Sequence, residues 1–152
     1  MRIELKDITK ENYREASFLT TNEDGQVTLQ EGCLMSNVFS LAELSFIPNT
    51  KALALYHEEV MIGFTFIGEK GNGEFWIFRY MLDHKYHGQG FGRVGFQKIL
   101  NYIDENYSPN DIYISFYVGN DRAQYLYESF GFTFTNIIEN NEKYYVVNRK
   151  KS

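Results

Sequence analysis

The chain has 152 residues, of which 43% are hydrophobic and 17% aromatic. This composition excludes intrinsic disorder, and it provides enough apolar side chains to fill the core of one domain over residues 1–152. Its 15 basic and 20 acidic residues give a net charge of −5, which excludes the basic surface that unspecific nucleic-acid or anionic-membrane binding requires. The lone cysteine, Cys33, is expected to be a small apolar residue, and no apolar run approaches the roughly 18 residues of a membrane span. We therefore expect a cytoplasmic protein without disulfides.

A strand and two helices are predicted in the first third of the chain. Apolar and polar residues alternate over 2–8, which predicts a strand. A helix is predicted over 9–19, and the polar segment 20–32 is predicted to be a loop or a fragmented helix. Ser36 is the candidate cap of a second helix, which must end before Pro48.

Strands dominate the middle of the chain. Two apolar runs, 52–57 and 60–67, flank an acidic turn and predict a hairpin. A glycine-rich turn then leads into a third strand of this section over 74–82. A helix is predicted over 90–106 because its apolar residues recur at helical spacing.

The last third predicts a strand over 112–118, a helix over 121–130 that is ended by Gly131, and a hairpin of 132–138 with 144–147. The predicted order of elements is therefore β-α-α-β-β-β-α-β-α-β-β. The fold class is a mixed α/β (α+β) sheet, which is antiparallel in its hairpins and can be parallel only across the last two helices.

The most informative segment is the glycine-rich stretch between the strand 74–82 and the helix that follows it. Gly88, Gly90 and Gly92 allow the backbone to approach a ligand closely, and the N-terminus of the next helix adds unpaired N–H groups with partial positive charge. Arg93 in the first helical turn opposes the helix dipole, which a bound phosphate would offset. The segment therefore predicts a pyrophosphate-binding cradle.

One candidate family for this loop is the dinucleotide-binding proteins, because residues 90–95 are Gly-Phe-Gly-Arg-Val-Gly and fit the pattern GxGxxG. That pattern requires a glycine directly after a buried strand and an acid at the end of the next strand. Here residues 83–89 intervene, and Asp111 precedes the next strand. The dinucleotide interpretation is kept as an alternative, whereas a Walker loop is excluded because no GK[ST] follows.

A second family pattern fits both the loop and a downstream segment. Residues 87–92, His-Gly-Gln-Gly-Phe-Gly, resemble the (Arg/Gln)-x-x-Gly-x-(Gly/Ala) signature of the GNAT superfamily of N-acetyltransferases, with His87 in place of the Arg or Gln. Residues 120–132, Asn-Asp-Arg-Ala-Gln-Tyr-Leu-Tyr-Glu-Ser-Phe-Gly-Phe, resemble the family's second signature, Asn-x-x-Ala-x-x-Leu-Tyr-Glu-x-x-Gly-Phe. The order of predicted elements also matches, and the layout resembles that of bacterial diamine and polyamine acetyltransferases.

The resemblance implies acetyl-CoA as co-substrate and assigns residues to it. In the family, the pantetheine arm lies where two strands splay apart and pairs with a strand backbone, which here is Tyr80-Met81-Leu82. Asn120 would bond the CoA chain, although it is also a good cap for the next helix. Tyr127 would protonate the departing thiolate, since tyrosine has a pKa near 10 and is protonated at neutral pH. The loop residues assigned to the pyrophosphate are His87, Gly88, Gln89, Gly90, Phe91, Gly92 and Arg93.

The sequence does not identify a general base. Relatives often carry an acid at positions that correspond to Ser115 or Phe78 here. The alternatives are Glu74, Glu43, His57 or a chain of water molecules.

Acidic residues are frequent in the two segments that would build the acceptor site, 20–48 and 134–150. Such residues attract a polyamine, an aminoglycoside or a basic peptide N-terminus, but an acidic solvated surface explains them equally well. The residues are Glu23, Asp24, Glu31, Glu43, Glu139 and Glu142.

The resulting hypothesis is an acetyl-CoA-dependent N-acetyltransferase that acts on a small cationic amine by direct attack on the thioester. A non-catalytic acyl-CoA-binding or regulatory module and an N-terminal peptide acetyltransferase are the alternatives. No metal is expected, because His84 and His87 have no further ligands near them in the sequence. A homodimer through sheet edges or the C-terminal hairpin is left open.

Overall fold

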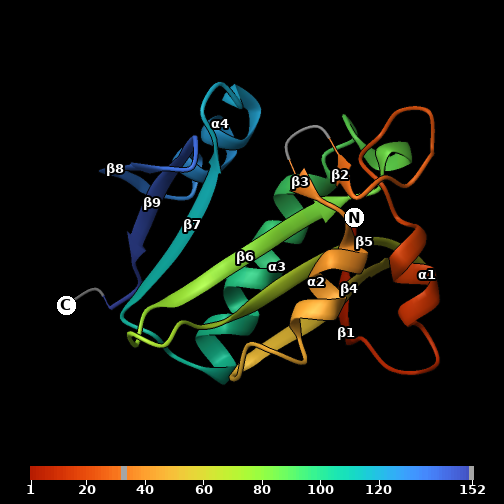
Figure 1. The fold of residues 1–152 in the computed structure, drawn as a ribbon, viewed down its shortest axis with the longest axis horizontal. Coiled ribbons are helices and arrows are strands. Elements are labelled where there is room, and N and C mark those ends of the chain that lie inside the picture. The colour runs from red at the N-terminus through yellow and green to blue at the C-terminus, as the bar shows by residue number, and fades with distance from the viewer. Residues whose placement is uncertain (32–33, 151–152) are drawn as a thin grey trace.

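The computed structural model describes residues 1–31 and 34–150 and contains a seven-stranded sheet flanked by helices (Figure 1). The strand order is β1-β4-β5-β6-β7-β9-β8, and among these strands every neighbouring pair is antiparallel except β6 with β7. Cys33 lies outside the described residues. The strands of the sheet are β1 (Glu4–Asp7), β4 (Thr50–His57), β5 (Val60–Glu69), β6 (Phe75–Leu82), β7 (Asp111–Tyr117), β8 (Thr133–Glu139) and β9 (Glu142–Asn148), and the short strands β2 (Gln30–Glu31) and β3 (Leu34–Met35) pair separately.

Helices cover both faces of the sheet and bury an apolar cluster against each face (Figure 1). Leu53 and Leu55 of β4 point towards α3 and α4, whereas Ala52 and Ala54 point towards α1 and α2, as the two-residue period of a strand requires. None of the described helices is both long enough and apolar enough to cross a bilayer. The helices are α1 (Tyr13–Phe18), α2 (Asn37–Glu43), α3 (Phe91–Asn106) and α4 (Asp121–Ser129), with a 3₁₀ turn η1 (His84–Tyr86) before α3.

The predicted mixed sheet is confirmed, with local differences. The first helix begins at Tyr13 rather than Thr9, because the Thr9 N–H donates to Asn12 Oδ1 at 2.7 Å and closes a turn before the helix. The segment predicted as a loop over 20–32 also contains strand β2. β9 pairs with the edge of β7 and separates it from β8, so parallel pairing occurs across α3 but not across α4.

Gly95 sets the distance between α3 and the sheet. A Cβ built at this position would lie 2.6 Å from Tyr80 Oη and 2.7 Å from Leu55 Cδ2, which is closer than real Cβ contacts. The last glycine of the GxGxxG pattern is therefore a packing residue, and only a residue without a side chain lets α3 approach β6 this closely.

We expect the substitution Gly95→Ala to destabilise the protein by about 1–3 kcal/mol, because the added methyl overpacks the contact between α3 and β6. Urea unfolding followed by circular dichroism measures the change. Gly71→Ala is the matched control, since a Cβ there meets nothing within 4 Å. Equal stability of the two variants would contradict the packing role of Gly95.

Candidate active site

A cleft opens where β6 and β7 separate. The two strands pair only through Phe75 with Ile112, Trp76 with Tyr113 and Ile77 with Ile114. Beyond these pairs they diverge (Figure 1) and form the walls of a cleft of about 510 Å³. The glycine loop, α4 and the segment between α1 and β2 complete the lining. The edge of β6 that faces this cleft has lost its partner strand, so its backbone groups are free to pair with a ligand.

The glycine loop presents a run of unpaired backbone donors. Gly88 and Gly90 adopt φ values of +73° and +88°, which favour glycine, and Gly90 is the N-cap of α3. Within the described residues, the N–H groups of 88–93 donate to no other protein group. Unpaired donors at the N-terminus of a long helix are suited to bind an anion, and the pyrophosphate-binding role of this loop stays a prediction.

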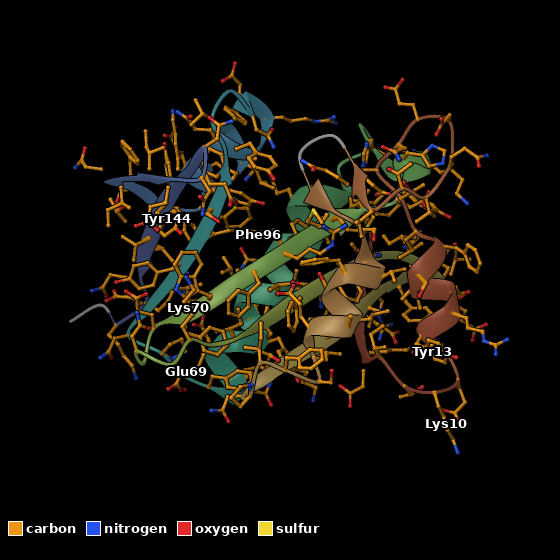
Figure 2. The ribbon with its side chains drawn as sticks, viewed as in Figure 1. Lys10, Tyr13, Glu69, Lys70, Phe96 and Tyr144 are labelled. Atoms are coloured by element: carbon orange, nitrogen blue, oxygen red, sulfur yellow. The ribbon has the colours of Figure 1, made fainter. Side chains whose placement is uncertain are left out.

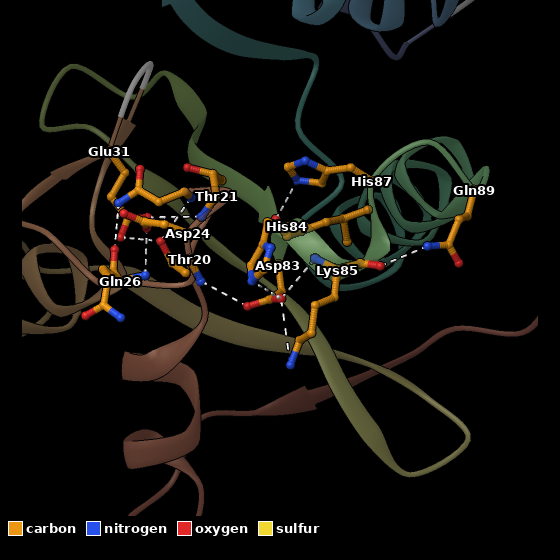
Figure 3. Close-up of polar contacts among 12 residues, drawn as sticks. Thr20, Thr21, Asp24, Gln26, Glu31, Asp83, His84, Lys85, His87 and Gln89 are labelled. Atoms are coloured by element: carbon orange, nitrogen blue, oxygen red, sulfur yellow. Dashed lines mark hydrogen bonds and ion pairs between the residues drawn. The ribbon is translucent and has the colours of Figure 1, made fainter.

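Side chains around the loop fix its shape (Figure 3). His87 Nε2 lies 2.8 Å from the Leu82 carbonyl oxygen; because a carbonyl only accepts, Nε2 carries a proton. Gln89 Nε2 donates to the Lys85 carbonyl at 2.8 Å, and Asp83 Oδ1 accepts from the Lys85 N–H at 3.1 Å. The His87 side chain therefore ties the loop to the end of β6.

Four of the residues assigned to acetyl-CoA have different surroundings, which the sequence alone does not reveal. Met81 and Leu82 are buried in β6 and line the cleft, so they can meet a ligand there through their backbone. The Phe91 side chain turns into the core against His57 and Tyr86. The Arg93 guanidinium is exposed and lies 5.3 Å from the centre of the Phe130 ring.

Tyr80 links β6 to the first turn of α3. Its hydroxyl donates to the Gly92 carbonyl oxygen at 2.7 Å. Burial and the neighbouring Tyr127 raise the pKa of Tyr80, so this hydroxyl stays protonated and the bond persists over the physiological pH range. The side chain of Tyr80 thus positions the helix N-terminus, a role that the sequence prediction, which used only its backbone, did not include.

Tyr127 lies in the wall of the cleft on the side of α4. Its ring is buried against Phe96, Phe116 and Phe132. Burial raises the pKa of Tyr127, which keeps the phenol neutral. Among the described atoms the Tyr127 hydroxyl has no hydrogen-bond partner, and it is accessible from the cleft. By contrast, Tyr125 on the same helix is 73% exposed and does not line the cleft.

Asn120 caps α4 and also lines the cleft. Its Oδ1 accepts from the Ala123 N–H at 3.2 Å, so the capping role considered for it is confirmed. The side-chain amide N–H groups donate to no group in residues 1–31 and 34–150, which leaves them available to a ligand.

A buried polar network, which sequence analysis missed, joins β6 to α1 and α2. Arg79 is 5% exposed, and its Nε donates to Asn37 Oδ1 at 2.8 Å, while Asn37 Nδ2 donates to the Ala16 carbonyl at 2.8 Å. Burial lowers the pKa of Arg79 to about 10, against the effect of Glu31. Arg79 Nη2 has no hydrogen-bond partner among the described residues. An arginine within an apolar strand is the sequence signal for this network.

The acidic residues expected to attract a cation fall into three groups. The expectation is wrong for Glu31, which is fully buried and whose carboxylate accepts from the Thr20 hydroxyl at 2.6 Å and from the N–H groups of Thr21 and Thr28 (Figure 3). The Glu31 carboxylate therefore stabilises the loop between α1 and β2 and is not available to a cation. Glu23 and Glu142 line the cleft, whereas Asp24, Glu43 and Glu139 are not among its lining residues.

The structure separates the candidate bases. Glu74 accepts from Trp76 Nε1 at 3.1 Å, and His57 Nδ1 lies 2.9 Å from the Arg2 carbonyl oxygen; neither residue lines the cleft. Phe78 and Ser115 do line it, and the Ser115 hydroxyl donates to Glu142 Oε1 at 3.0 Å. A carboxylate from β9 thus stands beside the β7 position where relatives often carry a glutamate.

Comparison with known proteins identifies the family. Residues 6–132 match the family model described as "Acetyltransferase (GNAT) family". The chain is 27% identical over 151 residues to the spermine/spermidine N(1)-acetyltransferase of Bacillus subtilis strain 168, covering 94% of this chain and 96% of that protein. An acetyltransferase from Thermus thermophilus superimposes with a TM-score of 0.76 at 15% identity over 97% of each chain. Spermidine N-acetyltransferase from Vibrio cholerae, solved with CoA and spermine, gives 0.72 at 17% identity over 97% of this chain and 95% of that one. The family match spans most of the chain and takes precedence over the dinucleotide-binding interpretation, so the chain belongs to the GNAT family of acetyltransferases.

Proposed function

We propose that this protein transfers the acetyl group of acetyl-CoA to a primary amine of a polyamine-like molecule by direct attack in a ternary complex. The observation that carries the proposal is the cleft between β6 and β7. Gly88 and Gly92 of the loop with unpaired donors, the free edge of β6 and Tyr127 all line this one space.

The residues present fit acetyl-CoA. The N–H groups of 88–93 would hold the pyrophosphate, and the open edge of β6 at Tyr80 and Met81 would pair with the pantetheine. The Leu82 carbonyl already accepts from His87, so Leu82 would share that group with a ligand. Asn120 would use its free amide N–H groups.

The transfer needs a donor for the leaving sulfur. The buried, neutral phenol of Tyr127 would supply a proton to the CoA sulfur as the carbon–sulfur bond breaks. Backbone N–H groups on the free edge of β6 would donate to the thioester oxygen, where negative charge develops.

Three observations support a cationic acceptor. Glu23 and Glu142 place carboxylates in the cleft, and the net charge of −5 favours approach of a cation. The relative from Bacillus subtilis bears the name of a spermine and spermidine acetyltransferase. Lys70 does not line the cleft and so does not oppose a cation there; its Nζ lies 3.8 Å from the centre of the Trp76 ring and 5.6 Å from that of Tyr144 (Figure 2).

We expect acetyl-CoA and CoA, but not NAD, to raise the melting temperature. A ligand that binds only the folded state adds about 2.7 kcal/mol at 100 times its Kd, which shifts the melting of a domain of this size by several degrees. Differential scanning fluorimetry measures the shift, and turnover over a panel of polyamines, an aminoglycoside and a peptide with a free N-terminus then identifies the acceptor. A shift with NAD and none with CoA would refute the proposal.

The substitution Tyr127→Phe is expected to lower kcat well over tenfold with little change in the Kd for CoA. The phenol donates its proton only while the carbon–sulfur bond breaks, and its ring packing is retained in phenylalanine. Thiol release assays and CoA titration measure the two quantities. Tyr125→Phe on the exposed side of α4 should behave as the wild type. Unchanged turnover of the Tyr127 variant would remove this residue from the mechanism.

A further inference from the structure

Two residues on neighbouring strands form a polar pair on the face of the sheet opposite Tyr127. In the antiparallel ladder of β7 and β9, Tyr117 stands opposite Glu142 and Ser115 opposite Tyr144. Opposed residues and residues two apart share a face, so Ser115 and Glu142 lie on the same face. The alternate residues Ile114, Phe116 and Tyr145 turn to the other face and pack in the cluster that contains Tyr127.

The carboxylate of Glu142 is held but not neutralised. One oxygen accepts from the Ser115 hydroxyl at 3.0 Å. In the described part of the chain, the second oxygen has no hydrogen-bond donor and the carboxylate has no ion-pair partner. The side chain is half-buried and lines the cleft. An oriented, half-buried carboxylate with an open oxygen and no cation suits an ammonium ligand.

We infer that Glu142, oriented by Ser115, binds the reacting ammonium group of the acceptor and takes a proton from it. This inference rests on the proposed function and names the group that the sequence left unidentified. It places the acceptor amine on the face of the sheet that carries Ser115 and Glu142, opposite the donor Tyr127.

The reaction needs an acceptor for the proton of the ammonium group, and Glu142 can serve as that acceptor. Alkyl ammonium groups have a pKa of about 10.4, so the acceptor arrives charged and its nitrogen has no lone pair to attack with. Glu142 removes one proton, and the nitrogen attacks the thioester carbon. The carbon–sulfur bond breaks, Tyr127 gives its proton to the sulfur, and the phenolate recovers one as the nitrogen loses its second. Glu142 returns its proton to solvent.

The charged and titratable neighbours of Glu142 leave this role intact. Lys143 Nζ is bonded to Gln124 Oε1 at 3.3 Å and belongs to the opposite face of β9. Burial, with Glu139 and then Glu142 and Glu74, raises the pKa of Tyr144, which therefore stays neutral. Lys70 Nζ lies 5.6 Å from the centre of the Tyr144 ring on this face and forms no ion pair with Glu142, and Glu74 also acts on Tyr144. The other charged or titratable groups are Tyr117 opposite Glu142 on β7 and the cleft residues Glu23, Arg79, Tyr80, Tyr86, His87, Arg122 and Tyr127.

The experiment compares Glu142→Gln with the wild type in two acceptors over pH 6 to 10. Spermidine is the basic acceptor and trifluoroethylamine, which is largely neutral at pH 7, is the weakly basic one. General-base removal is expected to lower kcat/KM for spermidine by about 10²-fold or more at pH 7. The loss should shrink as the pH rises towards the pKa of the amine and should be only a few-fold for trifluoroethylamine.

Matched variants separate this role from a structural one. Glu139→Gln, which changes the residue paired with Glu142 in the same hairpin but outside the cleft, should leave kcat/KM unchanged. Glu142→Asp should restore part of the activity, and Ser115→Ala should have an intermediate effect because it only frees the carboxylate. The melting shift with CoA should be that of the wild type in every variant.

Two results would overturn the inference: wild-type activity of Glu142→Gln, or an equal loss for both acceptors at every pH. Calorimetric titration of spermidine into the protein–CoA complex tests ammonium binding without turnover, and Glu142→Gln should weaken it at least tenfold. If the wild type binds CoA but acetylates none of the amines, the proposed function fails. The calorimetric comparison then still decides whether Glu142 binds an ammonium group.

Discussion

The site depends on one constraint, the loss of pairing between β6 and β7 after three residue pairs. A sheet interior normally satisfies every N–H and C=O, and unpaired groups there raise the free energy of the fold. This chain leaves the edge of β6 open to the cleft and satisfies only part of it from within, as when His87 bonds the Leu82 carbonyl. The remaining groups are fixed donors and acceptors that an extended ligand can complete as an added strand.

The cleft stays open because each wall is held from its other side. β7 is paired with β9 along its whole length, and β6 is paired with β5. Tyr80 ties β6 to the start of α3, and Gly95 lets that helix lie close to the sheet. The glycine loop therefore borders a preformed space. Because folding has already ordered its donor groups, ligand binding does not have to supply the free energy of ordering them.

The sequence was sufficient for the features that depend on local pattern, and insufficient for those that depend on register. Consecutive residues carry the signals for the helices and strands, for the glycine loop and for the segment that contains Tyr127. The pair of Ser115 with Glu142 joins residues 27 positions apart and exists because β9 inserts beside β7. Glu31 looks like any loop acid until the loop closes around it, and Asn37 looks like an exposed helix residue until it meets Arg79. Composition cannot separate these buried polar groups from solvated ones.

The alternation of side chains along a strand has a chemical consequence for this site. Phe116 turns towards α4 and helps to bury Tyr127, while Ser115, one residue earlier, turns to the other face and holds Glu142. A proton donor and a proton acceptor on the same face could meet and exchange a proton without any reaction. Placed on opposite faces of the separated strands, they can act on two different atoms of a thioester and an amine that meet between them. In the proposed reaction, Tyr127 protonates the sulfur from one face while Glu142 takes the first proton of the ammonium group from the other, and the second proton of the nitrogen restores the Tyr127 phenol.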